Sequence, residues 1–94
     1  MITPELTALE ALGIAIRSEI DAQELYKELA DKCKNEFFKD KLLNLHKEEK
    51  KHQAILENLH QQLFSEVELK IPPTETIKKK YLEIFKNLNL FRIF

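Results

Sequence analysis

Apolar residues recur every three or four positions over the first third of the chain, which is the spacing of one face of an α-helix. Thr3 is suited to cap this helix with Pro4 at its first position, and Thr7 with Glu10 offers a start one turn later. The pattern predicts one helix over residues 3–34, with an inward stripe formed by Leu9, Leu12, Ile16, Ala30 and Cys33.

Leucines repeat with the same alternating spacing in the middle of the chain and predict a second helix from about residue 36 to residue 65. Asn35 is suited to cap it, so we expect a tight reversal at residues 34–35 and two antiparallel helices. Each helix would be about 45 Å long at roughly 1.5 Å per residue, which is more than a hairpin can cover with its own side chains. The hairpin therefore needs a partner. The expected inward positions are Leu42, Leu45, residue 49, residue 52, Leu56, Leu59 and Leu63.

The pattern changes after Ser65, because Pro72 and Pro73 interrupt any helix and favour an extended segment. We expect a hairpin domain over 1–65, a proline-containing linker over 66–74, and a short C-terminal helix with an apolar tail over 75–94. An apolar chain end usually packs against its own domain or a neighbouring subunit, so we expect this tail to serve assembly. Its helical stripe consists of Ile77, Tyr81, Phe85 and Leu88.

Composition agrees with an all-α fold. One glycine and three prolines among 94 residues supply too few turns for an all-β protein. The net charge of -1 gives no electrostatic footprint for nucleic acid, and no segment is suited to a signal peptide or a membrane span. The single cysteine, Cys33, fits a reducing compartment, so the cytoplasm is the expected location.

Polar residues interrupt both inward stripes at the same depth. Glu49 and His52 stand where the second helix should carry leucine, and Glu19 and Gln23 stand on the stripe of the first helix. Glu19 precedes the reversal by about as many residues as Glu49 follows it. In an antiparallel pair these two carboxylates should face each other.

Burying unpaired carboxylates costs several kcal/mol, and no Lys or Arg lies on either stripe, so a metal ion is the remaining compensating charge. Glu-x-x-His on a bundle helix, with a further Glu from another helix, is the ligand pattern of di-iron and di-manganese carboxylate proteins. This chain carries half of that set. A symmetric homodimer would supply Glu19, Glu49 and His52 twice, and two divalent ions would neutralise the four carboxylates.

Other candidates have simpler interpretations. Glu57 and His60 also form Glu-x-x-His, but they lie beside the core positions, and His46 is expected on a solvated flank. Glu48 neighbours the register without continuing its spacing. Tyr26 is either a hydrogen-bonding neighbour of a ligand carboxylate or an ordinary core aromatic residue.

Two segments, Glu19-Ile20-Asp21-Ala22 followed by Tyr26, and Glu48-Glu49-Lys50-Lys51-His52, resemble the rubrerythrin branch of the ferritin-like superfamily over residues 5–64. The pattern is most similar to that of encapsulated ferritins, which are also half-length chains. This resemblance implies half of a four-helix bundle completed by dimerisation, a ring of dimers, and an encapsulin shell as partner. It also implies that Glu19, Glu49 and His52 are iron ligands with Tyr26 as their neighbour, and that Asp21 lies near the iron entry route.

The resemblance implies a ferroxidase that oxidises Fe(II) at a di-iron site for storage or detoxification. A peroxide-reducing di-iron enzyme of the rubrerythrin kind shares every ligand and is the first alternative, although one cysteine cannot form the four-cysteine electron-donor module of full rubrerythrins. A metal-free helical assembly module is the second alternative.

Overall fold

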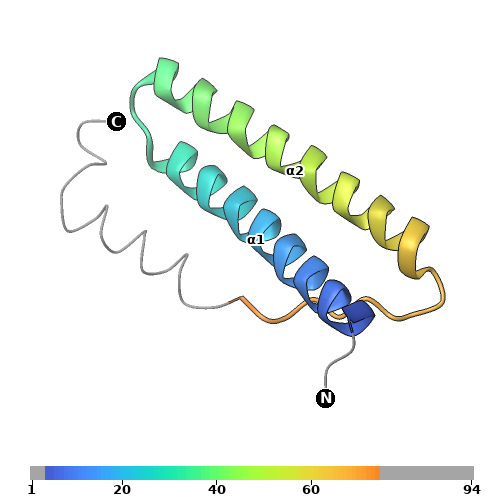
Figure 1. The fold of residues 1–94 in the computed structure, drawn as a ribbon. Coiled ribbons are helices and arrows are strands. Elements are labelled where there is room, and N and C mark those ends of the chain that lie inside the picture. The colour runs from blue at the N-terminus through green and yellow to red at the C-terminus, as the bar shows by residue number, and fades with distance from the viewer. Residues whose placement is uncertain (1–3, 75–94) are drawn as a thin grey trace.

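The computed structural model describes the backbone of residues 4–74 and the side chains of residues 8–74. Two antiparallel helices, α1 (Pro4–Lys32) and α2 (Glu36–Phe64), lie side by side along their whole length (Figure 1). The described residues contain no strand, so the predicted helical hairpin is confirmed. The predicted C-terminal helix over 75–94 lies outside the described residues. Neither described helix is long and apolar enough to cross a membrane.

The reversal between the helices is short because both helix ends are capped locally. The Cys33 N–H donates to the Ala30 carbonyl oxygen at 3.2 Å, which closes the last turn of α1. The Asn35 side-chain oxygen accepts a hydrogen bond from the Phe38 N–H at 3.1 Å, as expected of an N-cap. The predicted cap and turn are therefore confirmed.

The inward stripe of α1 is buried as its spacing predicts. Each large aliphatic side chain removed from water contributes about 1.5–3 kcal/mol, so this stripe supplies much of the stability of the hairpin. Gln23 is buried among these apolar residues. The buried apolar side chains of the described residues are Leu12, Ile16, Leu29, Ala30 and Cys33.

The single inward register predicted for α2 is wrong, because the structure divides it into two neighbouring rows. One row lies against α1 and is at least half-buried; it consists of Leu42, His46, Glu49, Gln53, Leu56 and His60. The other row contains Leu45, Leu59 and Leu63, which are 42%, 38% and 62% exposed, with His52 among them. A spacing of three and four residues alternates between two adjacent rows, and one partner helix covers only one of them. We call Leu45, His52, Leu59 and Leu63 the open row.

The predictions for His46 and His60 are also corrected. His46 is half-buried, not solvated, and its Nδ1–H donates to the Gln23 carbonyl oxygen of α1 at 2.8 Å. His60 is the buried residue of α2, with 7% of its surface exposed. Its Nε2–H donates to the Val67 carbonyl oxygen at 2.7 Å, so the ring fixes the chain as it leaves α2.

Residues 66–74, which we call the strap, run back along α1 (Figure 1). Gly13 permits this approach, because a Cβ atom at that position would overlap the Lys70 carbonyl oxygen. The predicted linker is therefore packed against the first helix and does not simply connect two parts of the chain.

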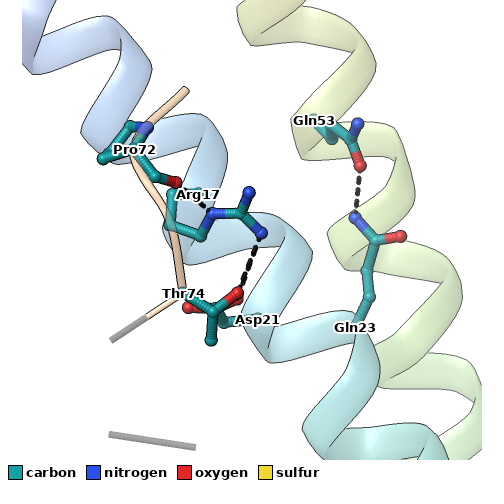
Figure 2. A network of polar contacts seen from close by, with 6 residues as sticks. All are labelled: Arg17, Asp21, Gln23, Gln53, Pro72 and Thr74. Carbon is teal, nitrogen blue, oxygen red and sulfur yellow. Dashed lines mark hydrogen bonds and ion pairs between the residues drawn. The ribbon is translucent and has the colours of Figure 1, made fainter. Parts of the chain in front are cut away.

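The far end of the strap is held by Arg17 and Asp21, one turn apart on α1 (Figure 2). Arg17 donates through Nε to the Pro72 carbonyl oxygen at 2.6 Å and through Nη1 to the Thr74 hydroxyl at 3.0 Å. The Thr74 hydroxyl in turn donates to Asp21 Oδ1 at 2.9 Å, and Arg17 and Asp21 form an ion pair at 3.5 Å.

Candidate metal centre

Glu19, Glu49 and His52 converge at mid-length of the hairpin. Glu19 comes from α1, whereas Glu49 and His52 lie three residues apart on α2, in its two neighbouring rows. Each offers one ligand atom, and these atoms all lie within 4.8 Å of one another. His52 Nδ1 is 3.4 Å from Glu49 Oε2 and 3.5 Å from Glu19 Oε2. The polar layer expected from the sequence is therefore one cluster in space.

The two carboxylates of the cluster are shielded from water, and the imidazole is not. The side chains of Glu19 and Glu49 are 22% and 18% exposed, whereas that of His52 is 51% exposed. Burial raises the pKa of Glu19 above its ordinary value of 4.5, and the neighbouring Glu49 carboxyl raises it further. His52 acts in the opposite direction but does not cancel the rise. The cluster therefore disfavours negative charge on Glu19.

One atom of this cluster lacks a hydrogen-bond partner among the described residues. Glu19 Oε2 is buried and accepts no hydrogen bond within the described part of the chain. Neighbouring cations form ion pairs elsewhere, Arg17 with Asp21 and Lys51 with Glu48. A buried carboxylate oxygen without a hydrogen bond costs free energy, and a divalent cation bound between the three ligand atoms would remove that cost.

The donor set fits iron. Two carboxylates and one imidazole suit a first-row divalent metal, and carboxylates also suit the harder ferric ion. Three protein donors leave positions for further ligands, and the exposed His52 ring lies on the side that α1 does not cover. The cluster can hold a metal ion, and its exposed member, His52, belongs to the open row of α2.

A second polar contact crosses between the helices at the level of the cluster. The Gln23 side-chain amide donates to Gln53 Oε1 at 2.6 Å, which joins α1 to α2 (Figure 2). Gln23 was expected in the polar layer, but Gln53 was not identified from the sequence. The available signal was its position four residues after Glu49, on the same side of the helix.

The remaining candidates lie in different surroundings. Tyr26 is half-buried on α1, two turns beyond Glu19, and its role beside a ligand stays a prediction. Asp21 lies in the strap contact with Arg17 and Thr74.

A family model described as rubrerythrin matches residues 10–91. The sequence has no match among curated proteins and none among solved structures. The matched region contains all three residues of the cluster and most of the chain, and rubrerythrin domains are ferritin-like domains that bind two iron ions. The chain belongs to the rubrerythrin family.

Proposed function

We propose that two copies of this chain form one di-iron centre and that this centre oxidises Fe(II) to Fe(III). The observation that carries the proposal is the convergence of Glu19, Glu49 and His52, with a buried Glu19 oxygen that accepts no hydrogen bond within the described residues. Iron is the substrate, and the cluster is the place where it is held and oxidised.

A second copy is needed because one hairpin supplies half of the ligands. Di-iron carboxylate bundles use a Glu from each of two helices and a Glu-x-x-His from each of the other two. Glu19 on α1 and the Glu49–His52 pair on α2 are one of each. Two hairpins related by a two-fold axis would provide the complete set.

The open row of α2 is the surface on which the second copy would pack. Leu45 and Leu59 lie seven residues on either side of His52, and all three side chains are exposed. A two-fold axis through the His52 layer would place Leu45 of one hairpin against Leu59 of the other. This is the self-complementary geometry of a symmetric dimer. The same contact would exclude water from the cluster.

The chemistry then requires little of the protein beyond placement. Iron supplies the electrons, since two Fe(II) ions and two protons reduce one dioxygen to hydrogen peroxide and leave two Fe(III) ions. Glu19 and Glu49 of both copies bind and offset the charge of the two ions, and the carboxylates bind the ferric product more strongly than the ferrous substrate. Glu19 must release any proton it holds before its buried oxygen can bind iron.

Assembly and storage are further parts of the proposal, and they rest on the resemblance to encapsulated ferritins. On that basis the dimers form a ring through residues 75–94, inside an encapsulin shell in the cytoplasm, and keep the oxidised iron there.

The family match also favours a second candidate, a peroxide-reducing di-iron enzyme with the same ligands. The two functions differ in the source of electrons. Sustained peroxide turnover with an external reductant would favour the second candidate, and oxidation in proportion to added Fe(II) would favour the first.

The test is oxidation of Fe(II) in air by metal-free protein, followed by the near-ultraviolet absorbance of Fe(III). We expect a fast phase that saturates at about one iron per chain, because a complete centre holds two ions per dimer. Glu49→Ala should remove this phase, whereas Glu57→Ala, an exposed glutamate on the same helix, should keep it. Equal rates in the two variants would refute the proposal. A purified protein that binds no iron would favour a metal-free assembly module.

A further inference from the structure

We propose that Gln23 and Gln53 are positioning residues for the metal cluster. Their side-chain hydrogen bond sets the register of α1 against α2, and that register brings Glu19 to Glu49. The inference rests on the proposed function, because it concerns how the same ligands are held. Neither glutamine needs to touch iron for this role.

Each glutamine lies one turn beyond a ligand. Gln23 follows Glu19 on α1 by four residues and Gln53 follows Glu49 on α2 by four, so each shares a helix face with its ligand. The Gln23 amide donates to Gln53 Oε1 at 2.6 Å, and Figure 2 shows the two side chains meeting between the helices. The bond therefore joins the two surfaces that carry the carboxylates.

The backbone at Gln23 is fixed as well. His46 donates its Nδ1–H to the Gln23 carbonyl oxygen at 2.8 Å, and His46 lies one turn before Glu49 on α2. Residues on both sides of Glu49 thus hold Gln23, one through its side chain and one through its main chain. This pair of contacts resists sliding and rotation of the helices at the level of the cluster.

The apolar contacts of the hairpin do not define the register in this way. Burial of Leu12, Ile16 and Ala30 is favourable but non-directional, so small shifts along the helix axis change it little. A buried amide behaves differently, because it loses its partner when the helices shift. Only 9% of the surface of Gln23 is exposed, so water cannot readily replace Gln53. Buried polar residues that specify register have this effect in coiled coils.

Such a contact matters most before metal binds. In the metal-free hairpin no ion draws the part-buried side chains of Glu19 and Glu49 together. The hydrogen bond between Gln23 and Gln53 holds the helices together beside the ligands, so the ligands are arranged before the ion arrives.

The test uses Co(II), whose visible absorption reports the number and geometry of its ligands. In Gln23→Leu/Gln53→Leu, two apolar side chains replace the bonded pair, so we expect helicity and thermal midpoint to be kept or increased. We expect the dissociation constant for Co(II) to rise ten- to a hundredfold, the usual effect of losing a group that orients a ligand, with an altered visible band. Each single leucine variant should lose about as much Co(II) affinity as the double variant, because the two amides act as one unit.

The matched control is Gln61→Leu, the same substitution at an exposed position of α2, which should leave the Co(II) affinity unchanged. Gln53→Glu keeps an oxygen that accepts from the Gln23 amide, so it should restore the wild-type absorption band. Should the double variant lose its helical circular dichroism, Gln53→Ala, which places a strong helix former at a part-buried position, tests the positioning role in the same assay.

A wild-type affinity and spectrum in the leucine variants would overturn the positioning role and leave the proposed function intact. A wild-type chain that binds no Co(II) would overturn both. These two failures are therefore distinguishable in one titration.

Discussion

The Oε2 atom of Glu19 lies 3.5 Å from Nδ1 of His52, and yet it is buried and accepts no hydrogen bond within the described residues. The oxygen and the ring nitrogen face each other across the two helices at ion-pair distance, without a hydrogen bond between them. Two ligand atoms that face each other in this way are expected around a cation. Because Glu19 is buried there, the stability of the metal-free protein should depend on pH.

The first prediction concerns this pH dependence. Because burial and Glu49 raise the pKa of Glu19 above 4.5, the folded hairpin holds a proton that the unfolded chain releases. The stabilising contribution of protonated Glu19 is fully present below pH 4.5 and is lost as the pH rises through the raised pKa. Urea unfolding of metal-free protein from about pH 4 to pH 7 should show this decline. Glu19→Gln, which stays neutral, should remove it, and an unchanged decline in that variant would assign the effect to another group.

The second prediction separates the two Glu-x-x-His histidines. His60→Ala removes a buried ring and the hydrogen bond to the Val67 carbonyl, so we expect a loss of about 1–3 kcal/mol of unfolding free energy. Fast iron oxidation should persist in the folded protein. His52→Ala should do the reverse, because its side chain is 51% exposed and contributes a proposed ligand. Thermal unfolding and stopped-flow absorbance measure the two effects, and loss of oxidation in His60→Ala alone would overturn the assignment.

The third prediction concerns the open row. Leu45→Lys or Leu59→Lys should weaken the proposed dimer at least tenfold, because each places a charge in an apolar contact. Ile14→Lys is the control, since Ile14 is also exposed, at 58%, but belongs to α1. Sedimentation velocity over a range of protein concentrations measures association. A dimer weakened equally by all three substitutions would not be packed on the open row.

The fourth prediction links metal to association. A ligand that binds only the dimer stabilises it by about 2.7 kcal/mol at a hundred times its dissociation constant. We therefore expect the dimer fraction to rise with Fe(II) and to fall with a chelator. Glu19→Gln/Glu49→Gln removes the carboxylate repulsion while nearly keeping the shape, so it should associate without metal and gain little from it. If association of the wild-type protein ignores metal, each hairpin binds its ion separately.

The fifth prediction concerns the strap. Alanine normally stabilises a helix interior over glycine by about 1 kcal/mol, but a Cβ on Gly13 would displace the Lys70 carbonyl. Gly13→Ala should therefore lower the stability and expose residues 66–74 to proteolysis. Arg17→Ala should also expose them, because it removes the bonds to Pro72 and Thr74. Metal affinity should be unchanged in both variants. Slower proteolysis of Gly13→Ala than of the wild-type protein would exclude the contact between Gly13 and the strap.

The sequence alone determined the helices, the cap at Asn35 and the level at which Glu19 and Glu49 meet. These features depend on contacts between residues three or four apart, or on equal distances from one reversal, and such relations can be counted along a chain. The Glu49–His52 pair was recognisable for the same reason, because polar residues interrupted a leucine spacing.

Only the tertiary structure decided which row of α2 faces α1, why His60 is buried while Leu59 is exposed, and where the strap lies. Two rows on one helix have the same spacing in sequence, and the choice between them depends on the position of the partner helix. The close contact between Gly13 and Lys70, and the bonds of Arg17 to Pro72 and Thr74, join residues more than fifty positions apart. No periodicity encodes contacts of that range, because they form only when the packed hairpin presents one face of α1 to the returning chain.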